Sequence, residues 1–332
     1  MGRVATNRSH ETQRHARLYG LTAAIVVGIA IALVAIFWAA QKMSSGAASA
    51  TAGSMPPPIA GGEFEASGVA HVPNTNQLLF VDDGTARQIF LMELTRDGKQ
   101  QGAAVPIALS ADVTDLEGMT FDGRHFYVVG SQSKLTGFEG DGLVRFTFDP
   151  KTRLVGGVER IQGLKTWLAA NVAELRGTET LLGDHVLNIE AIAWDSAGNR
   201  LLLGLRAPVV DGQALIVPVK LGDSGAAFSR DNLRVDGPAI RVSLDGAGIR
   251  SLEYDDRVKA YRLVTGATLN EETLEFRLVE WNGMPGSPVR DIATYSRHIK
   301  PEGITRAEID GRDVTVMVFD VGRFAMWVDE GP

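Results

Sequence analysis

A short motif that occurs five times from residue 66 onward constrains the fold of this chain more than any other feature. The copies lie at 66–71 (ASGVAH), 116–121 (LEGMTF), 189–194 (IEAIAW), 249–254 (IRSLEY) and 301–306 (PEGITR). Their starts are about 50 to 73 residues apart, and each is followed by apolar β-rich runs and by tight-turn residues such as Asp122-Gly123. Tandem all-β units of this size predict the blades of a β-propeller.

Two positions of the motif explain why it would repeat. The third position is always small and the fourth always a large aliphatic residue, with the third occupied by Gly68, Gly118, Ala191, Ser251 and Gly303. The first strands of all blades crowd around a propeller's axis, where small residues permit close backbone approach. The aliphatic residues would then fill the space between blades. We therefore predict an all-β, five-bladed β-propeller.

The blade count depends on how the ring closes. Only two strand-like runs follow the fifth motif. We predict that residues 61–66 (GGEFEA) supply the outer strand of the last blade, because the edge of that blade would otherwise carry unpaired backbone N–H and C=O groups. Six blades with one degenerate repeat remain the alternative. Residues 164–183 carry apolar side chains at helical spacing, which predicts a helical insertion. This insertion either covers the channel mouth or has a packing role only.

The segment before the motifs predicts a membrane anchor. Residues 21–40 carry no charge and are long enough to cross a hydrocarbon core of about 30 Å. Four arginines precede them and only Lys42 follows before Arg87, so the amino terminus is expected in the cytoplasm. We predict a basic tail (1–20), a transmembrane signal-anchor (21–40), a flexible linker (41–58) and a periplasmic propeller (59–332) on the inner membrane. Cleavage after Ala48-Ser49-Ala50 is the alternative.

Charge and composition exclude several classes of function. The net charge is −7, and the first twenty residues contribute +3, so the remainder carries −10. Such a charge disfavours nucleic-acid binding by the folded part. The sequence has no cysteine, which excludes disulfides, thiolate metal sites and thiol catalysis. Asp82-Asp83-Gly84 begins like a calcium-binding loop but lacks the rest of one, so an ordinary turn is expected.

Several motifs carry a resemblance to a known family. The segments 117–123 (EGMTFDG), 188–195 (NIEAIAWD), 204–208 (GLRAP) and 300–305 (KPEGIT) resemble the bacterial domain-of-unknown-function family numbered 3616. The resemblance covers roughly residues 60–328 and implies a propeller without implying an activity. The first strands are also similar to those of esterase-like phytases and lactonase-type propellers. That second resemblance implies channel-facing carboxylates that hold calcium, and only Glu117, Glu190 and Glu302 match this element.

The candidate site lies at one mouth of the predicted channel, where first strands begin and second strands end. Three glutamates are the expected metal ligands: Glu117, Glu190 and Glu302. Six further residues are expected to bind a ligand: Ser67, Asp82, Ser131, Arg206, Arg250 and Asp320. Converging carboxylates must bind a cation, pair with arginine or protonate. Calcium suits such oxygen ligands, and arginine suits a phosphate or carboxylate. A closed plug of salt bridges is the competing interpretation.

Two classes of function follow from this site. The first is a metal-dependent hydrolase of a phosphoester or lactone, with calcium held by the glutamates and a small anionic substrate oriented by arginine. The second is a non-catalytic interaction or scaffold propeller that binds a protein of the cell envelope. Both classes occur on propellers, so the fold does not decide between them.

Overall fold

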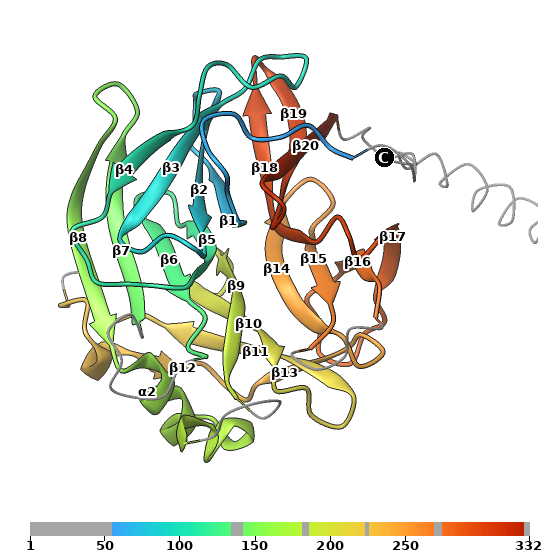
Figure 1. Cartoon of the computed structure of the whole chain (residues 1–332). Coiled ribbons are helices and arrows are strands. Elements are labelled where there is room, and N and C mark those ends of the chain that lie inside the picture. The colour runs from blue at the N-terminus through green and yellow to red at the C-terminus, as the bar shows by residue number, and fades with distance from the viewer. Residues whose placement is uncertain (1–54, 134–141, 181–185, 223–225, 269–273, 329–332) are drawn as a thin grey trace, which may run out of the picture. The chain divides into compact units, whose positions relative to one another are not determined.

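The computed structural model describes residues 55–133, 142–180, 186–222, 226–268 and 274–328. These residues form five antiparallel sheets arranged in a ring around the first strands (Figure 1).

Blade one contains β1 (Ala66–His71), β2 (Gln77–Asp82), β3 (Gln88–Glu93) and β4 (Val105–Ala108). Blade two contains β5 (Leu116–Phe121), β6 (Phe126–Gly130), β7 (Gly142–Asp149) and β8 (Leu154–Gln162). Blade three contains β9 (Asn188–Asp195), β10 (Arg200–Ala207), β11 (Gln213–Lys220), β12 (Arg234–Val235) and β13 (Ile240–Ser243). Blade four contains β14 (Gly248–Asp255), β15 (Ala260–Gly266), β16 (Phe276–Trp281) and β17 (Arg290–Tyr295). Blade five contains β18 (Pro301–Ile309), β19 (Arg312–Phe319) and β20 (Arg323–Val328). The all-β, five-bladed prediction is therefore confirmed.

The core is divided among the spaces between neighbouring blades. In β2, Leu78 and Phe80 pack against blade five, whereas Leu79 and Val81 pack against blade two. Successive side chains of a strand point to opposite faces, and in a propeller both faces are covered by another blade. This is why the second strands are continuous apolar runs instead of alternating ones. The cluster that includes Phe80 and Val316 joins the first blade to the last and closes the ring.

The small third motif position has the role that the sequence predicts. A Cβ atom added at Gly68 would lie 2.5 Å from the backbone nitrogen of Met119 in the next blade. A Cβ atom at Gly303 would collide with the carbonyl oxygen of Ser67. The first strands thus approach each other backbone to backbone, which larger side chains would prevent. At the fourth position, Met119 is buried in the space between blades one and two.

The ring closes through a different segment from the one expected. Residues 61–65 form no strand, because a turn at Ala60–Gly62 redirects the chain. Instead, Pro58 bridges Arg323, the Ile59 nitrogen donates to the Gly322 carbonyl at 2.9 Å, and the Phe324 nitrogen donates to the Pro57 carbonyl at 3.1 Å. The prediction that residues 61–66 supply the closing strand is therefore wrong, because residues 57–59 pair with the last strand instead. Proline lacks an N–H donor, but its carbonyl still accepts a ladder hydrogen bond at an edge strand.

Within the expected insertion 164–183, the structure has α2 (Leu164–Asn171) and the short 3₁₀ helices η2 (Ala173–Leu175) and η3 (Thr178–Thr180). Leu164, Leu168 and Leu175 are buried among the apolar residues that separate blades two and three. This burial supports the packing role that was predicted for the insertion. No helix of the described ranges is both long and apolar enough to cross a membrane. The predicted anchor at 21–40 lies outside the described residues.

We expect Ile59→Ala to lower the free energy of unfolding by about 2–4 kcal/mol, because the Ile59 side chain is 2% exposed and joins the closing segment to the core. Met55→Ala is the matched control, since Met55 is 49% exposed and its truncation should cost less than about 0.5 kcal/mol. Urea unfolding of both variants measures the difference. Equal effects of the two substitutions would contradict closure by this segment.

Candidate functional site

A β-bulge at the second motif position builds the channel mouth. In blade two, Leu116 pairs with Gly130 and Gly118 pairs with Val129, so Glu117 has no partner on the second strand. The same irregularity occurs at Glu190, Arg250 and Glu302, and at Ser67-Gly68 in blade one. A bulge re-aims the side chain of its extra residue. Five bulges at one level therefore direct the five second-position side chains toward the same mouth.

Arg250 lies between two of the predicted metal ligands. Its Nε atom is 3.2 Å from Glu190 Oε2, and its Nη1 atom donates a hydrogen bond to Glu302 Oε1. The Arg250 guanidinium also stacks over the Phe276 ring at 5.2 Å. Burial opposes the charge, but Glu190 and Glu302 raise the pKa of Arg250, which therefore stays protonated. One arginine thus neutralises the carboxylates of blades three and five.

Arg206, from the end of β10, completes the network at Glu190. Its Nη1 atom donates to Glu190 Oε1 at 2.8 Å, and its Nε atom donates to the Ala267 carbonyl at 3.2 Å. The Glu190 side chain is only 3% exposed, and each of its two carboxylate oxygens pairs with a different arginine. Because the Arg206 side chain remains 21% exposed, it is the part of this ion-paired group that solvent still reaches.

Glu117 differs from the other two glutamates. Within the described residues its carboxylate accepts a hydrogen bond from Ser67 Oγ at 3.2 Å, and no arginine pairs with it. Burial, followed by the nearby charges of Glu190 and Glu302, raises the pKa of Glu117 well above its usual value. A group with these properties holds a proton at a pH where most glutamates are ionised.

The remaining predicted residues lie nearby with partners of their own. The Asp82 carboxylate accepts the Glu65 backbone N–H at 3.2 Å, and the Ser131 hydroxyl donates to Asp115. Asp320 pairs with Lys300, and its charge contributes to raising the pKa of Glu302, after burial and Glu190 and against the attraction of Arg250. These residues surround the ion-paired group without joining it directly.

Several residues of the mouth were missed by the sequence reasoning. Glu65, Asp115 and Lys300 each stand two residues before the second motif position, and Asp83 follows the second strand of blade one. Burial, a side-chain hydrogen bond with Glu65 and nearby carboxylates raise the pKa of Asp83 to about 7. Extending the motif by one residue toward the amino terminus would have found Glu65, Asp115 and Lys300. Because an ordinary turn was expected at Asp82-Asp83-Gly84, Asp83 was not included in the candidate site.

The arrangement of the three glutamates bears on the predicted calcium site. Among the described residues, no three Asp, Glu or His side chains are grouped closely enough to share one metal ion. The reason is local: Arg250 separates Glu190 from Glu302, and Glu117 points to Ser67. Calcium needs six to eight oxygen ligands, which this set of side chains does not offer.

We expect the free energy of unfolding to fall as pH rises from about 5 to 8. The substitution Glu117→Gln should make this dependence on pH weaker. The pKa of Glu117 is raised above 4.5 in the folded state, so its contribution is complete below pH 4.5 and is lost as pH rises toward the folded-state pKa. At pH 8 the variant should therefore have a higher free energy of unfolding than the parent. Urea unfolding at both pH values tests this, with exposed Glu63→Gln as control. An unchanged slope in Glu117→Gln would show that Glu117 is ionised throughout.

Comparisons with known proteins give the following relatives. No protein of curated function matches the chain. Similar solved structures include the soluble aldose sugar dehydrogenase from Escherichia coli in its apo form, at 11% identity and a TM-score of 0.47, covering 82% of this chain and 99% of that one. A putative oxidoreductase (glucose dehydrogenase) from Thermus thermophilus has 14% identity and a TM-score of 0.40, with coverages of 80% and 93%. Likeness at this level carries no argument about activity. The model of the family described as "Protein of unknown function (DUF3616)" matches residues 182–318, which confirms the resemblance to that family over this part of the chain.

Proposed function

We propose that this propeller is a non-catalytic binding module of the cell envelope, and not a metal-dependent hydrolase. The observation that carries the proposal is the position of Arg250, which pairs with Glu190 and Glu302 and separates two of the expected metal ligands. A hydrolase of the phytase or lactonase type would use those carboxylates to hold its ion. Here the carboxylates neutralise arginines, and the mouth is a plug of ion pairs.

The same ion pairs weigh against an anionic substrate at the mouth. The Arg250 side chain is only 10% exposed, and its Nε and Nη1 atoms already pair with two carboxylates, which disfavours bidentate binding of a phosphate. The surrounding residues Asp115 and Asp320 add negative charge that acts on Glu117 and Glu302, respectively. Like charge repels an incoming anion. The plug therefore fixes the blades relative to one another and leaves recognition to the loops and turns around the ring.

We expect Glu190→Gln to lower the free energy of unfolding by about 3 kcal/mol, equally in calcium and in EDTA. The change leaves Arg206 and Arg250 underpaired, and removing one partner of a buried ion pair is costly. The parent protein should show the same melting temperature in both conditions, because a bound ion would add stability. Calorimetry in the two buffers measures both expectations.

The matched control for this substitution is Glu280→Gln, which breaks an ion pair with Arg290, a side chain that is 61% exposed. Its cost should stay below about 1 kcal/mol. A calcium-dependent rise in melting temperature that Glu190→Gln abolishes would overturn the proposal. Calcium-dependent hydrolysis of p-nitrophenyl phosphate or of a simple lactone by the purified chain would overturn it as well.

We further propose that residues 21–40 anchor the propeller to the inner membrane, with the propeller on the periplasmic side. The support is the uncharged run of twenty residues and the arginines at its amino-terminal side. Membrane anchoring suits a propeller that binds partners in the envelope, because the Ser- and Ala-rich residues 41–55 would tether it at a short distance from the bilayer.

We expect a reporter fused after Pro332 to be active only outside the cytoplasm, and the membrane-bound protein to keep its amino terminus. Substituting both Val26→Lys and Ile29→Lys should abolish export, because each lysine costs about 2.5–3.5 kcal/mol at the centre of a spanning segment. Paired substitution of Ser44 and Ser45 by lysine is the control. Recovery of a soluble form that begins near Thr51 would show cleavage and contradict the anchor.

A further inference from the structure

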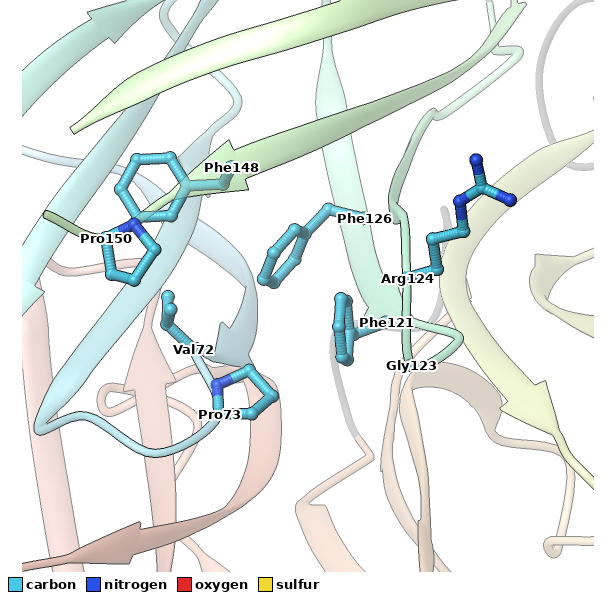
Figure 2. A pocket seen from close by; sticks show the side chains of 8 residues that line it. All are labelled: Val72, Pro73, Phe121, Gly123, Arg124, Phe126, Phe148 and Pro150. Atoms are coloured by element: carbon cyan, nitrogen blue, oxygen red, sulfur yellow. The ribbon is translucent and has the colours of Figure 1, made fainter. Parts of the chain in front are cut away.

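A pocket lined by aromatic rings lies away from the channel mouth, at the turns where first strands end. Its volume is about 390 Å³, within the range of small-molecule sites. Its walls come from the β1–β2 turn, the β5–β6 turn and the β7–β8 turn, which contribute Pro73, Phe121 and Pro150 among others (Figure 2). The pocket is thus the open end of the apolar cluster between blades one and two.

The rings form a continuous aromatic wall. Phe126 lies 4.5 Å from Phe121 and 6.4 Å from Phe148, measured between ring centroids, and the second pair meets edge to face. Phe126 is buried, whereas Phe121 and Phe148 are half-buried and present ring surface to the pocket. Figure 2 shows these rings and the two prolines around one space. Such a surface accepts a flat apolar group, because aromatic rings pack well edge to face or in offset stacks.

One charged side chain, Arg124, borders this apolar wall. Arg124 is exposed, and within the described residues its guanidinium has no ion-pair partner. In blade four the arginine at the same place of the hairpin, Arg257, pairs with Asp255 through Nε at 3.0 Å and Nη2 at 2.8 Å. Arg124 stands in the same relation to Asp122, yet no such ion pair forms.

Asp122 instead accepts hydrogen bonds from other groups. Its carboxylate accepts the backbone N–H groups of Arg124 and His125 at 2.7 and 2.6 Å, and the Tyr127 hydroxyl at 2.7 Å. The other nearby carboxylate, Asp149, accepts the backbone N–H of Lys151 at 2.9 Å. Both acidic groups are therefore held by their own turns. The Arg124 guanidinium points away from the rings in Figure 2, but the side chain is exposed, so its rotamer can change without breaking an ion pair within the described residues.

We propose that this pocket binds a small organic anion in which a flat ring is joined to a carboxylate. The ring would lie against Phe121, Phe126 and Phe148, and the carboxylate would pair with Arg124 at the rim. A concave apolar site with a small number of polar or charged groups is the usual design for such ligands. This site is separate from the channel mouth, so it does not depend on the role of the glutamates there.

The test uses the full-length chain and three probes: 3-phenylpropionate, its neutral amide and acetate. Titration followed by NMR or calorimetry should give a dissociation constant in roughly the millimolar range for 3-phenylpropionate. The amide should bind about five- to tenfold more weakly, because it lacks the charge. Acetate should not bind measurably, because it lacks the ring. Equal binding of the carboxylate and the amide would overturn the role of Arg124.

Two variants locate the binding. Arg124→Gln should weaken 3-phenylpropionate by about five- to tenfold and leave the amide unchanged, and Phe148→Ala should weaken both probes. Arg312→Gln is the matched control, because Arg312 is an exposed arginine at the β18–β19 turn of blade five. It should change neither affinity. If Arg312→Gln has the same effect as Arg124→Gln, or if no probe binds the parent protein, the pocket is not the proposed site.

Discussion

The close approach of five first strands around one axis is the constraint on which the rest of this structure depends. Where Gly303 passes Ser67, and where Gly68 passes Met119, one backbone lies directly against the next. Only small residues permit that approach. It sets the five blades at a common level, and the apolar clusters between blades then fill the wedge-shaped spaces that remain. The ring closes because the cluster between blades five and one is built like the others.

The crowding also fixes the electrostatics of the mouth. A bulge just before the small residue directs one side chain per blade toward the axis. Carboxylates brought together in this way repel unless they are neutralised, and Arg250 and Arg206 do so for Glu190 and Glu302. Glu117 lacks an arginine, and burial raises its pKa instead. The mouth therefore combines two physical solutions to one problem, ion pairing in blades three to five and protonation in blade two.

The two faces of the ring differ in how their charges are used. At the mouth the arginines are paired with buried carboxylates, so little of their charge reaches a ligand. At the opposite turns, Asp122 accepts hydrogen bonds from two backbone N–H groups and from Tyr127, and within the described residues Arg124 has no ion-pair partner beside the aromatic pocket. Asp255 differs, because its oxygens hold Arg257 and Arg262. The recognition surface is expected where charge remains available.

The sequence by itself determined the all-β class, the five blades and the small third motif position, because strand periodicity and close packing leave direct marks on residue size. It also brought Glu117, Glu190, Glu302, Arg206 and Arg250 into one candidate group. Only the tertiary structure decided which of these pair, because Arg250 could have faced either solvent or its neighbours, and a bulge is not visible in residue type. Closure by Pro57–Ile59 instead of 61–66 had the same origin: both segments are short and near one edge, and the turn at Ala60–Gly62 decides which reaches it. The aromatic pocket likewise arises from three turns in two blades, whose meeting depends on the ring and not on any local pattern.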